Sequence, residues 1–120
     1  MSSVQTLLTQ AAETIRTLER EAQEALHGQG DKEAYTAKLT EKCHILLDLG
    51  DRLEEPLEAV RGKDSAEAAR IEAQLDSYAQ RANAALSLKS VFFMAALLYP
   101  DDYKDGEPND LERFVESLGE

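Results

Sequence analysis

The sequence predicts an all-α protein, and three features of the chain support this fold class. Its 120 residues suit a single domain, and 42% hydrophobic with 31% charged residues is a balance typical of globular proteins. Ala, the residue with the highest helix propensity, is abundant, whereas Gly and Pro are few. Apolar residues recur at steps of three and four, which is the spacing of one helical face. We therefore predict one helical-bundle domain over residues 1–120.

The first helix is predicted over residues 3–27, where apolar residues from Val4 to Leu26 form a single stripe. Gly28 and Gly30 end this helix, because glycine enters the left-handed conformation at little cost.

The second helix is predicted over residues 31–61, with Asp31 as its N-cap. Gly50 weakens this helix, and Pro56 lacks a backbone N–H and clashes with the preceding turn. We therefore expect a kink near Gly50–Pro56, and Gly62 closes the segment.

The third helix is predicted over residues 65–99, opened by Asp64 with Glu67 and stopped by Pro100. A polar loop follows. The last, short helix is predicted over residues 109–118, with Asn109 and Glu112 as a capping box.

Short connections at residues 28–30 and 62–64 favour antiparallel neighbours. The expected architecture is an antiparallel, up-down-up three-helix bundle with the short C-terminal helix packed on it. In this arrangement, the end of the third helix lies beside the end of the first helix and the start of the second.

Residues 91–99 form an apolar run that covers every side of the third helix. The neighbouring stripes, rich in alanine, cannot cover all of it, and large exposed apolar patches usually mark interfaces. The last helix or a second chain is expected to cover the remainder, and a homodimer is slightly favoured. The candidate contact residues are Phe92, Phe93, Met94, Leu97, Leu98, Tyr99, Phe114 and Leu118.

The formal net charge of −11 restricts the choice of partners. Residues 101–120 hold eight acidic and two basic residues, a net charge of −6. Such a field repels nucleic-acid phosphates and anionic lipid surfaces, so we predict neither as a partner. A basic protein partner is compatible with this charge, which makes an acidic decoy one alternative function.

One set of carboxylates suggests an enzymatic alternative. Glu55 and Glu58 lie on one face of the second helix, and Glu72 and Asp76 lie one turn apart on the third. If they converged, these four oxygen ligands could hold Mg²⁺.

The Glu55-Pro56-Leu57-Glu58 element resembles the E-x-x-E motif of the all-α nucleoside triphosphate pyrophosphohydrolases of the MazG type. That resemblance implies a magnesium site and hydrolysis of nucleotide phosphates. The second element departs from the family's E-x-x-D, because three residues separate Glu72 from Asp76.

Cys43 is the only cysteine, so no intramolecular disulfide can form, and a buried, inert thiol is expected. The run at 91–99 is too short to span a bilayer, which needs about 20 residues. The N-terminus lacks the basic start and apolar stretch of a signal peptide, and we expect a cytoplasmic location.

We predict from the sequence a non-catalytic helical interaction module, such as an adaptor, small chaperone or regulatory subunit, without a cofactor. The sequence names no partner, pathway or ligand.

Overall fold

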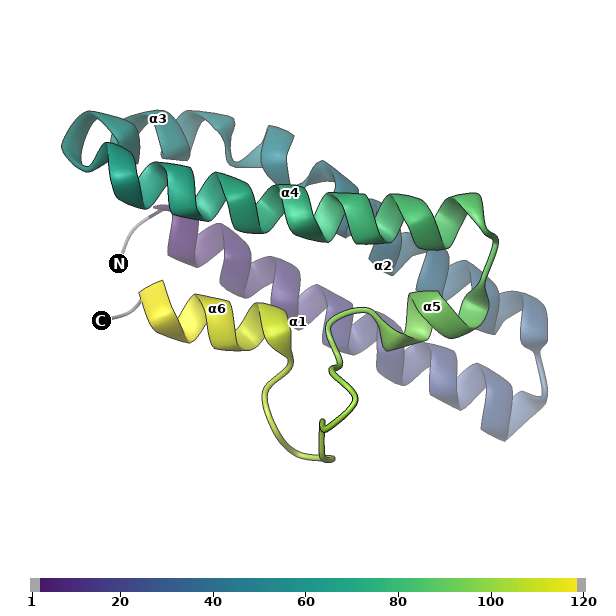
Figure 1. The fold of residues 1–120 in the computed structure, drawn as a ribbon. Helices are drawn as coiled ribbons and strands as arrows, with labels where there is room; N and C mark the ends of the chain where they lie inside the picture. Colours follow the sequence, from purple (N-terminus) through teal and green to yellow (C-terminus); the bar gives the residue numbers. More distant parts are fainter. Residues whose placement is uncertain (1–2, 119–120) are drawn as a thin grey trace.

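The computed structural model describes residues 3–118, and every regular element in this range is helical, which confirms the predicted all-α class (Figure 1). The elements are α1 (Ser3–Gln23), its π-helical continuation η1 (Glu24–Gly28), α2 (Lys32–Arg52), α3 (Glu54–Lys63), α4 (Ser65–Ser87), α5 (Val91–Ala96) and α6 (Asp110–Leu118).

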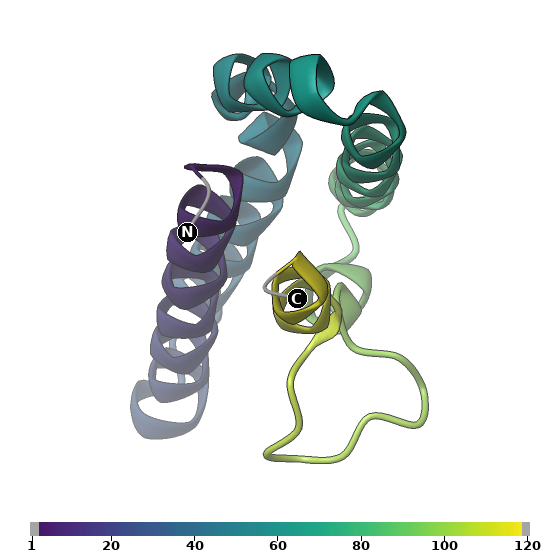
Figure 2. The same ribbon diagram turned by 90° about the vertical axis from the view of Figure 1, so that its left-hand side faces the viewer.

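The helices pack side by side around one core. The chain runs along α1, returns along α2 and α3, and runs back along α4 (Figure 1). Helix α2 packs against both α1 and α4, and α6 packs against α1. Figure 2 shows α6 lying between α1 and α4, so the C-terminal helix fills the side of the bundle that α2 leaves open. Within the range 3–118, no helix is both long and apolar enough to cross a membrane.

Three of the four predicted helix starts are confirmed by capping bonds, and the cap of the first helix lies outside the described residues. The Asp31 carboxylate accepts a hydrogen bond from the backbone N–H of Ala34 at 3.0 Å, which caps α2. The Asp64 carboxylate caps α4 in the same way. Asn109 and Glu112 form the reciprocal capping box expected for α6, with N···O distances of 2.8 and 2.9 Å.

The predicted break in the second helix is confirmed. Helix α2 ends at Arg52 and α3 begins at Glu54, and the buried Leu53 between them has φ −98° and ψ 3°. Pro56 lies in the first turn of α3. Its missing N–H costs little there, because the first N–H groups of a helix have no partner within it.

The prediction of one continuous third helix over residues 65–99 is wrong. Helix α4 ends at Ser87, and Lys89 takes a left-handed conformation with φ 52°. The Ser90 side chain then accepts a hydrogen bond from the N–H of Phe93, which caps the separate helix α5. The bend places Met94 and Leu98 in the core. A straight helix would carry this segment past the core and leave apolar side chains in water.

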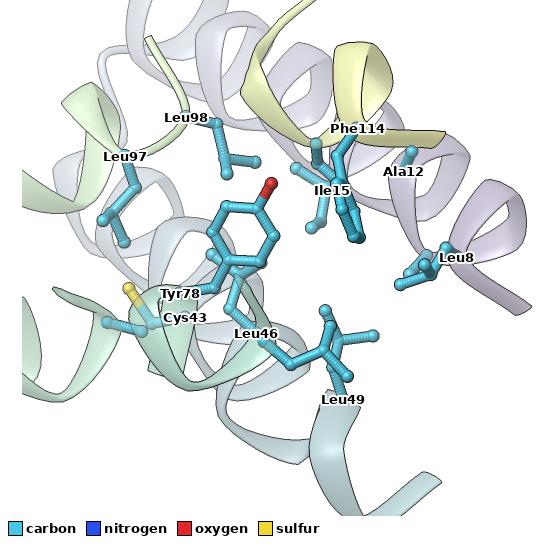
Figure 3. Close-up of a cluster of buried hydrophobic side chains, with 14 of the residues drawn as sticks. Leu8, Ala12, Ile15, Cys43, Leu46, Leu49, Tyr78, Leu97, Leu98 and Phe114 are labelled. Carbon is cyan, nitrogen blue, oxygen red and sulfur yellow. The ribbon is translucent and has the colours of Figure 1, made fainter. Parts of the chain in front are cut away.

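Side chains from all sides of the bundle form one core (Figure 3). Ile15 of α1, Leu46 of α2, Tyr78 of α4 and Phe114 of α6 point toward one another in this view. Burial of a large apolar side chain stabilises a fold by about 1.5–3 kcal/mol. Cys43 is fully buried among these residues, as predicted.

Candidate functional site

The bend between α4 and α5 leaves an apolar surface uncovered. Leu88 is 65% exposed, Phe92 is 75% exposed and Phe93 is 49% exposed, and they are the large hydrophobic side chains that remain exposed among residues 3–118. We call these three residues the elbow patch. The rings of Phe92 and Phe93 meet edge to face with their centroids 5.7 Å apart, so the two aromatic side chains form a single projecting feature.

An apolar groove of about 290 Å³ adjoins the elbow patch. Helix α4 and helix α5 form its two walls, and Arg81 is the charged residue in its lining. The other lining residues include Ala84, Leu88, Phe93, Ala96 and Leu97. Small alanine side chains in the walls leave the groove open, while the larger residues give it an apolar surface. Its shape and chemistry suit an apolar side chain from another molecule.

Helix α5 is held between two residues in the left-handed conformation, Lys89 with φ 52° and Leu98 with φ 76°. Neither is glycine, so each conformation costs about 1–2 kcal/mol. Such backbone strain persists where the surrounding structure fixes it, and it clusters at functional sites. One of the two residues, Lys89, directly follows Leu88 of the elbow patch.

The structure divides the candidate contact residues into separate groups. Phe92 and Phe93 are exposed, in agreement with a contact role. For Met94 and Leu98 the prediction is wrong, because the bend of the chain places both in the core. Leu97 is buried beneath the groove.

The remaining candidate residues lie away from the elbow patch. Tyr99 belongs to a polar cluster on α1, Phe114 covers the core, and Leu118 is half-buried beside it. Of these, Phe114 has the covering role that the sequence suggested for the last helix.

A polar cluster that sequence reasoning missed fixes the loop after α5 to α1. The Arg16 guanidinium donates to both carboxylate oxygens of Glu112, at 3.0 and 2.7 Å. It also donates to the hydroxyls of Tyr99 and Tyr103 and to the carbonyl of Glu107. These partners lie 83 to 96 residues away along the chain, so no local pattern could reveal them.

Lys42 is the buried charge beneath α5. Its side chain is 0% exposed, and its Nζ lies 2.9 Å from the Glu19 carboxylate. It also donates to the carbonyls of Ala95 and Leu97, at 3.3 and 2.9 Å. Burial lowers the pKa of Lys42, and the neighbouring Glu19 opposes this change. The Lys42 ammonium therefore fastens the C-terminal end of α5, whose last carbonyls would otherwise have no helical partner.

The sequence does contain a signal for Lys42. Leu39, Lys42 and Leu46 follow at steps of three and four, so Lys42 lies in the apolar stripe of α2. For a lysine at such a position, the usual expectation is that the methylene chain lies along the apolar surface and the ammonium group reaches water.

A pocket of about 820 Å³ lies beside this polar cluster, and its lining includes Arg16, Glu19, Tyr99 and Tyr103. These side chains bond to one another or to the backbone. The Tyr99 hydroxyl, for example, donates to Glu19 at 2.5 Å and accepts from Arg16. Their polar atoms are thus used in holding the loop and α6 against α1. We therefore assign the cluster a structural role.

The Arg16–Glu112 pair gives a pH-dependent prediction. The hydrogen bond from Arg16 holds the pKa of the Glu112 carboxyl below its usual value of 4.5. A folded-state pKa that is lowered contributes stability above the unfolded pKa, and this contribution is lost as the pH falls through the folded pKa. At neutral pH, Glu112→Gln is expected to lower the free energy of unfolding by about 1 kcal/mol, because Arg16 is partly exposed.

Urea unfolding of the Glu112→Gln variant and of the unmodified chain, repeated from neutral to acidic pH, measures this difference. The difference should shrink toward zero in acid. Glu116→Gln, at an exposed position of the same helix, serves as the control and is expected to change stability little. A Glu112→Gln difference that stays constant into strong acid would contradict the assigned role.

The structure brings together three of the four carboxylates considered as an alternative metal site, Glu58, Glu72 and Asp76, but not Glu55. Arg61 pairs with both Glu58 and Glu72, so a positive charge occupies the position a cation would need. Glu58, Glu72 and Asp76 share a pocket of about 360 Å³ with Arg61, and Glu55 is exposed outside its lining. Within residues 3–118, no three or more His, Cys, Asp or Glu side chains are grouped so as to hold a metal ion.

Cys43 has no activating environment. Its side chain is fully buried, and burial raises the pKa of the thiol. A cysteine nucleophile needs a lowered pKa and access to its substrate. Cys43 therefore acts as a small apolar core residue, as predicted.

Comparison of the chain with family models, with curated proteins and with solved structures gave no match in any of the three cases.

Proposed function

We propose that this protein is a non-catalytic helical interaction module that binds a protein partner through the elbow patch. The observation that carries the proposal is the exposure of Leu88, Phe92 and Phe93 together at one bend. Leaving a large apolar side chain in water forgoes about 1.5–3 kcal/mol that burial would contribute. A partner that covers three such side chains recovers much of this free energy.

The fold beneath the patch supports this proposal, because it holds α5 in place before any partner arrives. Lys42 bonds to the carbonyls of Ala95 and Leu97, and Ser90 caps the start of the helix. Met94 anchors the inner face of α5 in the core. A preorganised surface loses less conformational entropy on binding than a flexible one. The elbow patch therefore suits a specific interface.

Aromatic side chains also favour a protein partner. Binding free energy at protein interfaces concentrates in a few residues, and aromatic residues are enriched among them. Phe92 and Phe93 would act as such anchors, and the groove between α4 and α5 would receive an apolar side chain of the partner.

Selection of binders from a displayed library of random peptides tests the proposal. We expect peptides selected on the unmodified chain to lose binding by about tenfold or more when Phe92→Ser and Phe93→Ser are combined. The control combines Glu54→Ser with Glu55→Ser on exposed positions of α3, which lies at the other end of the molecule from α5 (Figure 1). This control should bind the peptides unchanged.

Two results would contradict the proposal. One is a selection that yields no peptide sensitive to the double Phe substitution. The other is equal loss of binding in the α3 control. Sedimentation over a range of protein concentrations tests whether the partner is a second copy of this chain. Self-association that disappears with the double Phe substitution would support the elbow patch as an interface and identify another copy of this chain as its occupant.

A further inference from the structure

We infer that the groove at the elbow patch takes an amphipathic α-helix of a partner protein whose polar face is acidic. This inference rests on the proposed function and specifies the partner's chemistry. The shape of the groove, the charges around it and the state of Arg81 support it.

The shape of the groove suits a helix. Its α4 wall extends from Arg81 to Leu88, which is about 10 Å along a helix that rises 1.5 Å per residue. That length matches about two turns of a partner helix, enough for apolar side chains at positions i, i+3 or i+4, and i+7. Phe93 on the α5 wall faces the same space. An amphipathic helix can therefore place one apolar stripe in the groove.

The charge of this part of the chain is opposite to that of the rest. Between Asp76 and Asp101 the sequence contains no acidic residue and two basic residues, Arg81 and Lys89. The net charge of residues 77–100 is thus +2, and the remainder of the chain has −11 − 2 = −13. Both basic residues are exposed, Arg81 in the groove lining and Lys89 at the bend next to Leu88. This charge pattern complements carboxylates.

The ion pair of Arg81 among residues 3–118 is a long one, which a carboxylate of a partner can replace. Its nearest carboxylate, that of Asp110, lies 3.9 Å away, at the limit of an ion pair. Its guanidinium rests over the ring of Tyr78 at 5.5 Å, which positions the group at the groove without using its hydrogen-bond donors. A guanidinium can bind a carboxylate through two parallel hydrogen bonds. A glutamate or aspartate on the partner helix would form such a pair at the edge of the groove.

Two other occupants fit these charges less well. A symmetric contact with a second copy would bring two sets of Arg81 and Lys89 together, and like charges repel across an interface. An anionic lipid surface extends beyond the groove, so the acidic remainder of the chain, with its net charge of −13, would repel it. An acidic helix in the groove is attracted by Arg81 and Lys89, and its apolar stripe is buried against the groove.

The test uses two synthetic peptides with the same apolar stripe of leucines. The acid-faced helix carries Glu on its polar face, and the base-faced helix carries Lys at the same positions. Glu and Lys have similar helix propensities, so the two peptides differ mainly in charge. We expect the acid-faced helix to bind the unmodified chain about three- to tenfold more tightly at physiological salt, with the preference shrinking at high salt.

The preference should disappear when Arg81→Gln is combined with Lys89→Asn, while the apolar part of the binding remains. Asn tolerates the left-handed conformation of Lys89, so this substitution changes the charge without straining the bend. Lys89→Asn alone should reduce the preference in part, which keeps the test valid if Arg81→Gln disturbs the contact with Tyr78. The double Phe substitution should abolish binding of both peptides.

Equal binding of the two peptides, or tighter binding of the base-faced helix, would overturn the inference. If this binding still depends on Phe92 and Phe93, the proposed function survives. No binding of either peptide also overturns the inference, and the library selection then decides the proposed function independently. Patch-dependent binding to phosphatidylcholine vesicles containing phosphatidylglycerol, or patch-dependent self-association that excludes the acid-faced helix, would assign the groove to a lipid surface or a second copy instead.

Discussion

Replacing Lys42 with Met is expected to lower the free energy of unfolding by about 3 kcal/mol. The substitution keeps most of the side-chain volume but removes the charge that pairs with Glu19. It leaves a largely buried carboxylate without its cation and takes a donor from the carbonyls of Ala95 and Leu97. Equilibrium urea unfolding followed by circular dichroism measures this loss.

Lys38 provides a matched control for the Lys42 substitution. It also lies on α2 and pairs with α1 through Glu21 at 3.1 Å, but both side chains of that pair are more than a third exposed, at 35% and 41%. Exposed ion pairs contribute about 0–1 kcal/mol, so Lys38→Met should have a small effect.

A double-substituted chain tests how Lys42 acts. Because Glu19→Gln removes the unpaired charge, adding it to Lys42→Met should recover part of the lost stability. Equal effects of the Lys38 and Lys42 substitutions would contradict the stabilising role of the buried Lys42–Glu19 pair beneath α5.

Leu111→Ala is expected to destabilise the fold by about 3 kcal/mol. Leu111 is 0% exposed and belongs to α6, the helix that fills the space between α1 and α4 (Figure 2). Truncation of this side chain leaves a cavity where α6 meets the core. Thermal or urea unfolding measures the effect.

Leu88→Ala is the matched control, because it removes the same atoms from a residue that is 65% exposed. Its effect should stay within about 0.5 kcal/mol. Similar losses for the two Leu→Ala substitutions would contradict both the burial of Leu111 and the exposure of the elbow patch.

Local signals in the sequence predicted much of the fold. Each capping residue, such as Asp31 or Asn109, bonds to a backbone N–H two or three residues away, so its chemistry is readable without the rest of the chain. The break at Gly50–Pro56 is local for the same reason. Helix starts and the interruption of the second helix could therefore be predicted from the sequence.

The bend at Lys89 could not be predicted from local signals in the sequence. Residues 65–99 are a good helix by local pattern, and the bend forms because tertiary burial of Met94 and Leu98 outweighs the cost of left-handed Lys89 and Leu98. This competition involves residues from several helices. As a result, the sequence indicated the excess of apolar surface near residues 91–99 but could not separate the exposed Phe92 from the buried Met94.

The polar contacts beneath α5 and α6 could not be predicted from the sequence for a related reason. Arg16 and Lys42 each pair with groups far along the chain, and their exposure depends on how the loop after α5 folds back. Two of the acidic residues that suggested an alternative metal site, Glu58 and Glu72, pair instead with Arg61. The pairing of Arg61 with Glu72 joins two helices and is set by the tertiary structure, whereas its pairing with Glu58 joins residues three apart on α3.

Mapping of amide chemical shifts during titration with the acid-faced helix tests most directly whether the elbow patch is the binding surface. We predict that the largest shifts fall on residues 81–97, around Leu88, Phe92 and Phe93, with little change in α3. Shifts centred on α3 or on the pocket beside Arg16, with the elbow unchanged, would contradict this account.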